Sequence, residues 1–350
     1  MNAHRHALVS FSEINLEPGA ELLLGNGLGV SLTPRFAYSS LRDAGVHAGH
    51  IGDIEQNLFQ AFGTADFELV LRRLLEASTV NQLVGVNESV TREHYDRLRT
   101  GLVKTLHEVH PSKDQFSSQD LLRIGGCLSQ FSRVFTTNYD LLTYWAMSAH
   151  GFGAFTDYFF SSDLTFDPFN VEVWGKRTEV FYLHGALFLM SSGSGGQQGG
   201  GDHSTTAETR KLRHSMANSL LDQVDQELRG GILPIFVSEG RPGDKRFAIA
   251  RNAYLTFAWQ QFRTQRRELV VFGHSLSSSD SHIVDALNAS VGLKHVAISI
   301  YAGTADEKAI LDNVEWCRSR LSPLVRQGTQ LTFFDSDTCP LSGAYSQEIT

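Results

Sequence analysis

Residues 133–142, with the sequence RVFTTNYDLL, join an apolar strand directly to a cluster of polar side chains. Val134 and Phe135 are typical of a buried β-strand, and each of the next five residues, 136–140, carries a hydrogen-bonding group in its side chain. Such a cluster at a strand end indicates either a polar turn that caps the following helix or a ligand-binding site. The other strands of the chain help to decide between these interpretations.

Short apolar runs recur along the chain and alternate with segments of helical spacing. Besides the run at 133–136 they lie within 20–25, 179–189, 231–240, 267–280, 294–304 and 329–337. This alternation predicts an α/β fold with a doubly wound, mostly parallel, Rossmann-like sheet.

The domain organisation follows from where this alternation is interrupted. Helical spacing of apolar residues from 53 to 130 predicts a helical insertion or a small second lobe. We therefore expect the first strand and a glycine-rich nucleotide loop in 1–52, the helical lobe in 53–130, the rest of the nucleotide-binding domain in 131–340 and a tail in 341–350. The glycine- and serine-rich segment 191–206 predicts a flexible surface loop.

Polar or glycine clusters follow five of the predicted strands. Because ligands of open α/β sheets bind outside the carboxyl ends of the strands, these clusters predict one shared crevice. The clusters are Gly25-Asn26-Gly27, the segment 136–140, His184-Gly185, Gly273-His274-Ser275 and Ala302-Gly303-Thr304.

Each cluster taken alone also has a purely structural interpretation. The glycines around Asn26 are equally consistent with a tight turn and with a loop that binds a pyrophosphate. His184 could be a hydrogen-bonded structural histidine, although an imidazole at a strand end is well placed for proton transfer. Asn138 and Asp140 could cap the helix that begins near Leu141.

Composition bears on partners, metals and location. The formal net charge of −8 and the lack of a long basic run argue against direct nucleic-acid binding. The three cysteines, Cys127, Cys317 and Cys339, form no CxxC pair, so we expect neither a metal site nor a disulfide framework, and a reducing compartment. No leader-like segment opens the sequence and no window approaches 18 apolar residues, so we expect a cytoplasmic protein that does not enter membranes.

Several of these motifs, in this order, resemble the sirtuin fold. The motifs are GNGLGVS, TTNYD, LHG and FGHSL, and PRFAY at 34–38 is similar to the sirtuin cofactor loop. Sirtuin deacetylases carry a four-cysteine zinc module after the histidine strand, whereas this chain has no cysteine there. The combination is similar to a divergent, zinc-free branch of sirtuin-like proteins, the NAD hydrolases of bacterial antiphage defence.

The resemblance implies a role for each matched residue. Asn138 would hold the attacking water and the ribose, Asp140 would accept a hydrogen bond from the nicotinamide carboxamide, and His184 would act on the ribose hydroxyls or activate the water. Further NAD contacts would come from the glycine loops and the segments beside them: Gly25, Asn26, Gly27, Phe36, Thr137, Gly273, Ser275 and Gly303.

The resemblance also implies a function. We expect hydrolysis of NAD to nicotinamide and ADP-ribose, with NAD as substrate and no metal, in a regulated effector that depletes NAD. Because uncontrolled NAD loss would kill a host, we expect an activating protein partner or ATPase, and a homo-oligomer. Two other functions stay open: a sensor or scaffold that binds NAD or ADP-ribose without turnover, and an NAD-dependent protein deacylase.

Overall fold

A computed structural model describes residues 8–36, 41–65, 67–169, 177–191, 208–213, 219–230, 232, 234–237, 242–264 and 266–345. Most of the glycine- and serine-rich segment 191–206, expected to be a surface loop, lies outside these residues. Within them, no helix is both long enough and apolar enough to cross a lipid bilayer.

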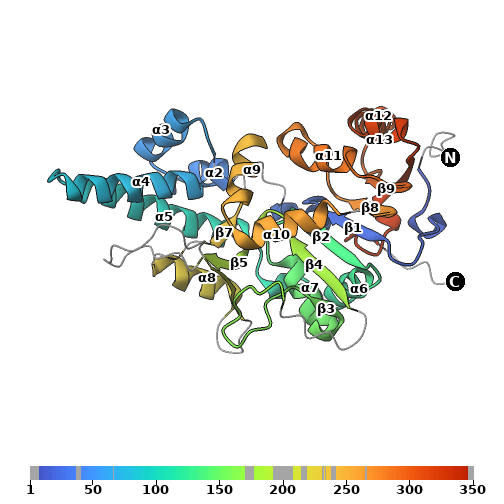
Figure 1. The fold of residues 1–350 in the computed structure, drawn as a ribbon, viewed down its shortest axis with the longest axis horizontal. Coiled ribbons are helices and arrows are strands. Elements are labelled where there is room, and N and C mark those ends of the chain that lie inside the picture. The colour runs from blue at the N-terminus through green and yellow to red at the C-terminus, as the bar shows by residue number, and fades with distance from the viewer. Residues whose placement is uncertain are drawn as a thin grey trace.

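A parallel β-sheet forms the centre of the molecule (Figure 1). Its seven described strands lie in the order β10-β9-β8-β1-β2-β4-β3, and every pair of neighbours is parallel. The strands are β1 (Glu21–Leu24), β2 (Arg133–Thr136), β3 (Phe155–Thr156), β4 (Thr178–Tyr182), β8 (Glu268–Phe272), β9 (His295–Ile300) and β10 (Gln330–Asp335). The predicted doubly wound α/β sheet is confirmed.

Strand order reverses beside the central strand β1. The chain first builds the sheet outward from β1 through β2 to β4, and then returns to place β8 on the other side of β1. All four residues of β1 are buried, as is typical of a strand covered on both faces. The gap between the carboxyl ends of β1 and β8 is therefore the topological switch point, where such sheets bind ligands.

Helices cover both faces of the sheet (Figure 1). One layer contains α6 (Ser118–Leu128) and α7 (Leu142–His150), which pack against each other, and the other contains α11 (Ser281–Asn288), α12 (Glu307–Arg320) and α13 (Ser322–Arg326). The side chain of Ser117 accepts a hydrogen bond from the Asp120 N–H at 3.0 Å and so caps the start of α6. The short α1 (Gly27–Leu32) follows β1, and α10 (Ala253–Phe262) packs against β4.

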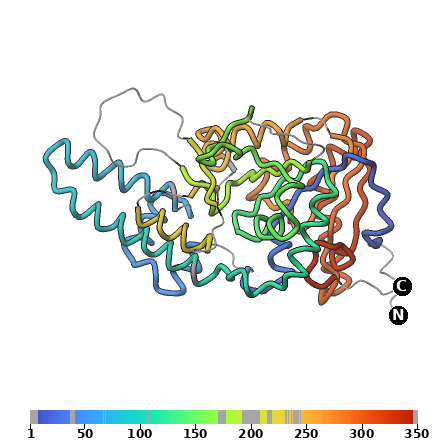
Figure 2. The backbone as a smooth tube through the Cα atoms, turned by 90° about the horizontal axis from the view of Figure 1, so that it is seen from below, coloured from blue at the N-terminus to red at the C-terminus, as the bar shows by residue number. Residues whose placement is uncertain are grey.

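A second lobe extends from one end of the sheet. It contains α2 (Leu41–His47), α3 (Asp53–Phe62) and a long hairpin of α4 (Phe67–Leu83) and α5 (Ser89–Val109), which runs away from the strands (Figure 2). Against it lie α8 (Leu220–Arg229) and a small antiparallel sheet of β6 (Thr209–Lys211), β5 (Gly185–Ser191) and β7 (Pro234–Phe236). Two separate insertions thus build this lobe.

Several element boundaries differ from the sequence prediction. The run 179–189 is two strands, β4 and β5, because the chain turns at His184 and Gly185 has a positive φ of 73°. Residues 53–130 were expected to form the helical lobe, but α6, which falls within this range, packs against α7 beside the sheet. Helix α10 is capped by Asn252 and is preceded by a separate helix, α9 (Pro242–Ala250).

Short 3₁₀ turns complete the described elements, and the edge strand β3 was not predicted. The turns are Phe11–Glu13, Pro34–Phe36, Lys113–Gln115, Phe152–Ala154, Ser278–Asp280 and Ser336–Thr338.

Candidate functional site

The carboxyl ends of four adjacent strands lie at the same level. The register pairs Leu24 of β1 with Thr136 of β2 and with Phe272 of β8, and it pairs Thr136 with Tyr182 of β4. The residue two positions beyond each of these partners is polar, which places four polar side chains in a row across the switch point. They are His274, Asn26, Asn138 and His184, in the spatial order of the strands.

Backbone hydrogen bonds keep the chain segments aligned for one residue beyond the strand ends. The Gly25 N–H donates to the Phe272 carbonyl at 2.9 Å, and the Leu183 N–H donates to the Thr136 carbonyl at 2.8 Å. The Asn138 side chain adds a further link, because its Nδ2 donates to the Gly25 carbonyl at 3.1 Å. Asn138 is 6% exposed, so this amide is fixed close to the β1 loop rather than free in solvent.

The glycines of the first loop are required by contact with the β8 loop. A Cβ atom on Gly25 would lie 2.5 Å from the Gly273 carbonyl oxygen, and one on Gly27 would lie 2.5 Å from the Gly273 Cα. The Gly27 N–H donates to the Gly273 carbonyl at 2.8 Å, and Gly273 itself has a φ of +64°. Because the N–H groups of Gly25 and Gly27 already have partners, a pyrophosphate here would have to be bound by other donors.

Asp140 has the helix-capping contact that the sequence left open. Its Oδ1 accepts a hydrogen bond from the Leu142 N–H at 2.7 Å, at the start of α7. Burial raises the pKa of Asp140 to about 6, although this hydrogen bond opposes the shift. The capping contact gives a structural role to one oxygen of the Asp140 carboxylate. The role of Asp140 toward nicotinamide stays a prediction.

His110, at the end of α5, supports the same turn from the second lobe. Its Nε2 accepts a hydrogen bond from the Leu141 N–H at 3.1 Å, and its Nδ1 lies 2.8 Å from the Pro111 carbonyl oxygen. Since one ring nitrogen must accept and the other must donate, His110 is neutral with its proton on Nδ1. The sequence analysis did not identify this residue.

His184 is buried among other titratable side chains. It is 4% exposed, and its Nε2 lies 2.9 Å from the Nε2 of His282 in α11. Burial holds the pKa of His184 well below its usual range, although the charge of Asp280 opposes the shift. The ring is therefore neutral near pH 7 and able to accept a proton.

Three further side chains surround this histidine pair. Asp280 Oδ1 accepts from the Lys245 ammonium at 2.7 Å, and Asp280 Oδ2 lies 3.8 Å from the Nε2 of His274. Burial by itself would raise the pKa of Asp280, but the neighbouring His184 and His274 rings and the Lys245 ammonium hold it below the usual range. The sequence placed His274 in the cluster after a predicted strand, but it gave no sign that His274, Asp280 and His282 converge on His184.

The same cluster contains donors of the kind that bind transition metals. One ligand atom each from His184, Asp280 and His282 lie within 4.8 Å of one another. Two imidazoles and a carboxylate are a donor set that zinc accepts. No metal site was expected from the sequence, since that expectation rested on the scattered cysteines and His184 lies far along the chain from Asp280 and His282.

The remaining predicted NAD contacts are dispersed. Asn26 is exposed and its Nδ2 donates to the Phe36 carbonyl at 2.9 Å, while the Phe36 ring is buried edge-on to His110 with ring centres 5.4 Å apart. Thr137 is half-buried, and its hydroxyl donates to the Leu24 carbonyl at 3.2 Å. The Ser275 side chain is exposed at the β8 loop.

Gly303 lies apart from the β1 loop. It lines a cavity of about 370 Å³ with residues from the N-terminal segment, the end of β10 and the start of α12. None of the residues that line this cavity belongs to the carboxyl ends of β1, β2 or β4. Gly303 thus follows β9 at the same carboxyl edge of the sheet, but it lines a separate cavity away from the switch point.

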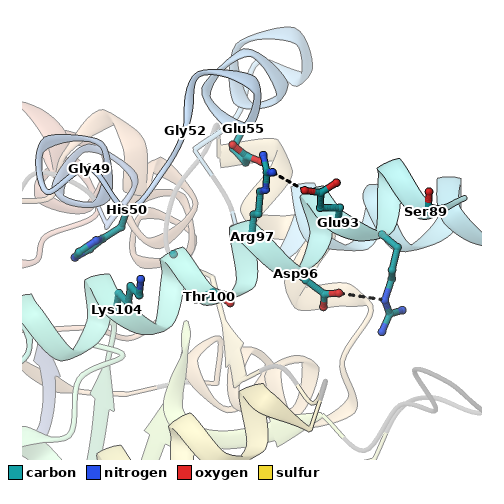
Figure 3. A pocket seen from close by; sticks show the side chains of 12 residues that line it. Gly49, His50, Gly52, Glu55, Ser89, Glu93, Asp96, Arg97, Thr100 and Lys104 are labelled. Atoms are coloured by element: carbon teal, nitrogen blue, oxygen red, sulfur yellow. Dashed lines mark hydrogen bonds and ion pairs between the residues drawn. The ribbon is translucent and has the colours of Figure 1, made fainter.

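A second cavity, of about 720 Å³, lies on the lobe between α5 and the link from α2 to α3 (Figure 3). Its charged side chains mostly pair with one another: Arg97 with Glu93, and Arg92 with Asp96 at 3.7 Å. This mutual pairing leaves no strong preference for an anion or a cation.

Fold and site together define a Rossmann-like α/β protein with a row of polar side chains across its switch point. The chain belongs to the family described as a domain of unknown function (DUF4917), whose model matches residues 22–341. No curated protein matches the sequence. Because the family match spans β1 to the end of η7 (Ser336–Thr338) and beyond, the second lobe is part of the family's shared unit.

Proposed function

We propose that this protein hydrolyses NAD to nicotinamide and ADP-ribose. The observation that carries the proposal is the placement of Asn138 and His184 at equivalent positions on the adjacent strands β2 and β4, beside the switch point. The resemblance of the motifs to zinc-free sirtuin-like NAD hydrolases supports the same substrate.

The reaction breaks the bond between the ribose C1′ and the nicotinamide nitrogen. Nicotinamide leaves with the electron pair and becomes neutral, so it needs no proton, and the ribose passes through an oxocarbenium-like state. Water then bonds to C1′ and releases a proton. Asn138 would position the water and ribose, and neutral His184 would accept a proton from the water or a ribose hydroxyl.

Asp140 and the first loop would complete substrate binding. A carboxyl group whose pKa is raised to about 6 can accept from the carboxamide of nicotinamide when it is ionised. Gly25 and Gly27 would act through their close contact with Gly273, which sets the shape of the switch point that the substrate would enter. The residues named here are sufficient for hydrolysis, and we propose NAD as substrate with no metal in the chemical step.

The test is nicotinamide release by the wild type and by Asn138→Ala and His184→Ala. Each substitution should lower turnover by about 100-fold or more, because each removes a positioned polar or acid–base group. His150→Ala is the matched control, since His150 is an exposed histidine at the end of α7 and should keep full activity. Near-wild-type turnover in both site variants would show that the site is assigned wrongly.

A sensor or scaffold is the second candidate, and the burial of the site favours it. Asn138 is 6% and His184 is 4% exposed, which suits a tight complex that excludes water. NAD binding by the wild type, without nicotinamide release under any activating condition, would support a sensor. A requirement for an acylated peptide would instead indicate a deacylase.

We further propose that the activity is regulated and serves bacterial antiphage defence in the cytoplasm. The support is the sirtuin-like resemblance, together with the harm that unregulated NAD loss would do. An activating protein partner or ATPase and a homo-oligomer belong to this proposal.

A further inference from the structure

We infer that His282 is a positioning residue that orients the His184 ring and shares one proton with it. Asp280 and Lys245 hold the pair in this state. The inference rests on the proposed function, because it concerns how His184 would act in NAD hydrolysis.

The hydrogen bond between the two rings fixes how His184 can react. The two Nε2 atoms are 2.9 Å apart, and such a bond needs an N–H on one side and a lone pair on the other. The pair therefore shares a single proton between its facing nitrogens. With Nε2 engaged, Nδ1 is the ring nitrogen of His184 that remains for the substrate.

The groups around the pair keep its orientation. Both rings are buried, with His282 only 1% exposed, and the Trp259 ring of α10 packs beside His282 with ring centres 5.5 Å apart. His274 Nδ1 accepts from the Leu276 N–H at 3.1 Å, so the neutral ring carries its proton on Nε2, which faces Asp280.

The titratable groups that face the pair come from three other segments. Asp280 belongs to η6 (Ser278–Asp280), Lys245 belongs to α9, and His274 follows β8. Farther out, the exposed Arg246 and Asp285 lie 3.9 Å apart and are screened by solvent. Asp280, whose side chain is half-buried, is thus the negative charge nearest the pair among the described residues.

This arrangement moves positive charge away from the reacting sugar. When His184 Nδ1 takes a proton, its Nε2 proton can pass to His282, so His184 stays neutral and His282 becomes the cation. A cation on His184 would repel the positive ribose in the transition state, whereas a cation on His282 faces the Asp280 carboxylate. After the products leave, the two transfers run in reverse: His282 returns the proton to His184 Nε2, and His184 Nδ1 releases its proton to solvent, so no atom is gained or lost.

Two geometric facts favour a hydrogen-bonded pair over a metal site made from the same residues. Two imidazole nitrogens on a tetrahedral zinc, each about 2.0–2.1 Å from the ion, would be about 3.3 Å apart, which is wider than the observed 2.9 Å. The Lys245 ammonium also lies against Asp280, where it would repel a bound cation. His274 cannot add a neutral ligand through Nε2, because that nitrogen carries its proton.

The experiment compares His282→Ala and His282→Gln with the wild type. We expect His282→Ala to lower kcat roughly 10- to 100-fold while KM for NAD stays within about threefold, because His282 does not contact the substrate. His282→Gln should recover part of kcat, since an amide can hold His184 but cannot take up its proton. The acidic limb of the kcat–pH profile should shift in both variants but not in His150→Ala.

A second measurement does not depend on activity. Nitrogen-15 NMR of the histidine rings should show both His184 and His282 neutral at pH 7, with one shared Nε2 proton, and this signature should vanish in either alanine variant. This spectrum tests the pairing even if the wild type releases no nicotinamide. A lack of nicotinamide release would refute the proposed function but not the pairing of the two rings.

Three results would overturn the inference. One is wild-type kcat and an unchanged pH profile in His282→Ala when His184→Ala is inactive. Another is a wild-type spectrum that shows no proton shared between the two rings. The third is one tightly bound metal per wild-type chain that is lost in both alanine variants, because the cluster would then be a metal site. If His282→Ala fails to fold, His282→Gln and the wild-type spectrum still decide.

Discussion

At the scale of single residues, the glycines at the switch point give a direct test of the contact between the β1 and β8 loops. Gly27→Ala should lower the free energy of unfolding by roughly 1–3 kcal/mol, because its Cβ would lie 2.5 Å from backbone atoms that cannot move away cheaply. Urea denaturation measures the loss. Gly153→Ala is the control, since nothing lies within 4 Å of its added Cβ. An equal loss of stability in Gly153→Ala would show that the contact with the β8 loop is not the cause.

Buried titratable groups predict how stability depends on pH. Burial lowers the pKa of His184 and of His274, and lowers that of His282 to about 4. As pH falls below about 6.5, the unfolded chain binds protons that these folded rings do not, so stability decreases. Asp140 acts in the opposite sense: its pKa is raised to about 6, so it stabilises the fold as pH falls toward about 4.

Burial also raises the pKa of Glu21, so three histidines oppose two carboxyl groups, and the free energy of unfolding should decrease between pH 6.5 and 4. Each uncompensated group contributes at most about 1.4 kcal/mol per pH unit. Urea titrations at pH 7, 6 and 5 measure this slope. His282→Gln should make it shallower, and Asp140→Asn, which keeps a capping oxygen, should make it steeper. A shallower slope in Asp140→Asn would contradict the assignment.

The sequence predicted some site residues and could not predict others, for a physical reason. Asn138 and His184 each follow an apolar strand, so their neighbourhood at the sheet edge follows from strand order alone. His282 lies 98 residues from its partner, in a helix on the far side of the switch point. The two rings meet only because the chain crosses from β4 back to β8 on the other side of β1. The spacing of residues within one segment cannot predict this crossover.

At the scale of elements, His110 at the end of α5 stabilises the turn that carries Asn138 and Asp140 through a hydrogen bond. His110→Phe should keep the aromatic contacts with Phe36 and Trp145 but remove the acceptor for the buried Leu141 N–H. An unpaired buried donor costs about 1–3 kcal/mol, so we expect a loss of that size in thermal or urea unfolding.

The matched control for this change is His50→Phe on the same lobe. His50 pairs with Glu108, whose side chain is mostly exposed, so its replacement should change stability by less than about 0.5 kcal/mol. Equal effects of His50→Phe and His110→Phe would show that the Leu141 hydrogen bond does not stabilise the turn.

Apolar periodicity predicted most strands and the lobe helices, but not where single elements break. A run such as 179–189 has continuous apolar character, and its division into β4 and β5 depends on the positive φ of Gly185. The two-residue strand β3 has no detectable pattern of its own, because it is defined by pairing with β4. Tertiary pairing, rather than local propensity, decided these cases.

At the scale of the whole molecule, the second lobe joins two insertions that lie far apart in the sequence. The ion pair between Arg210 and Glu227 links β6 with α8, and α8 in turn packs on α5. His110 then connects the lobe to the polar turn after β2. Movement of the lobe would therefore act on the candidate site through a short and defined contact.

The tip of the α4–α5 hairpin lies at the end of the lobe far from the sheet (Figure 2). Five apolar side chains there are more than half exposed: Val80, Leu83, Val84, Val86 and Val90. Apolar groups gathered in this way mark surfaces that associate with other molecules. We expect the tip to contribute to the homo-oligomer proposed above.

Leu83→Glu tests this expectation. Leu83 is 80% exposed, so its replacement should change the free energy of unfolding by less than about 0.5 kcal/mol. It should nevertheless lower the molar mass measured by light scattering at high protein concentration, because a charge at the tip opposes burial against a second copy. Val291→Glu adds the same charge at another exposed apolar residue, between α11 and β9, and should leave the mass unchanged. Identical masses for wild type and Leu83→Glu at every concentration would show that the tip takes no part in self-association.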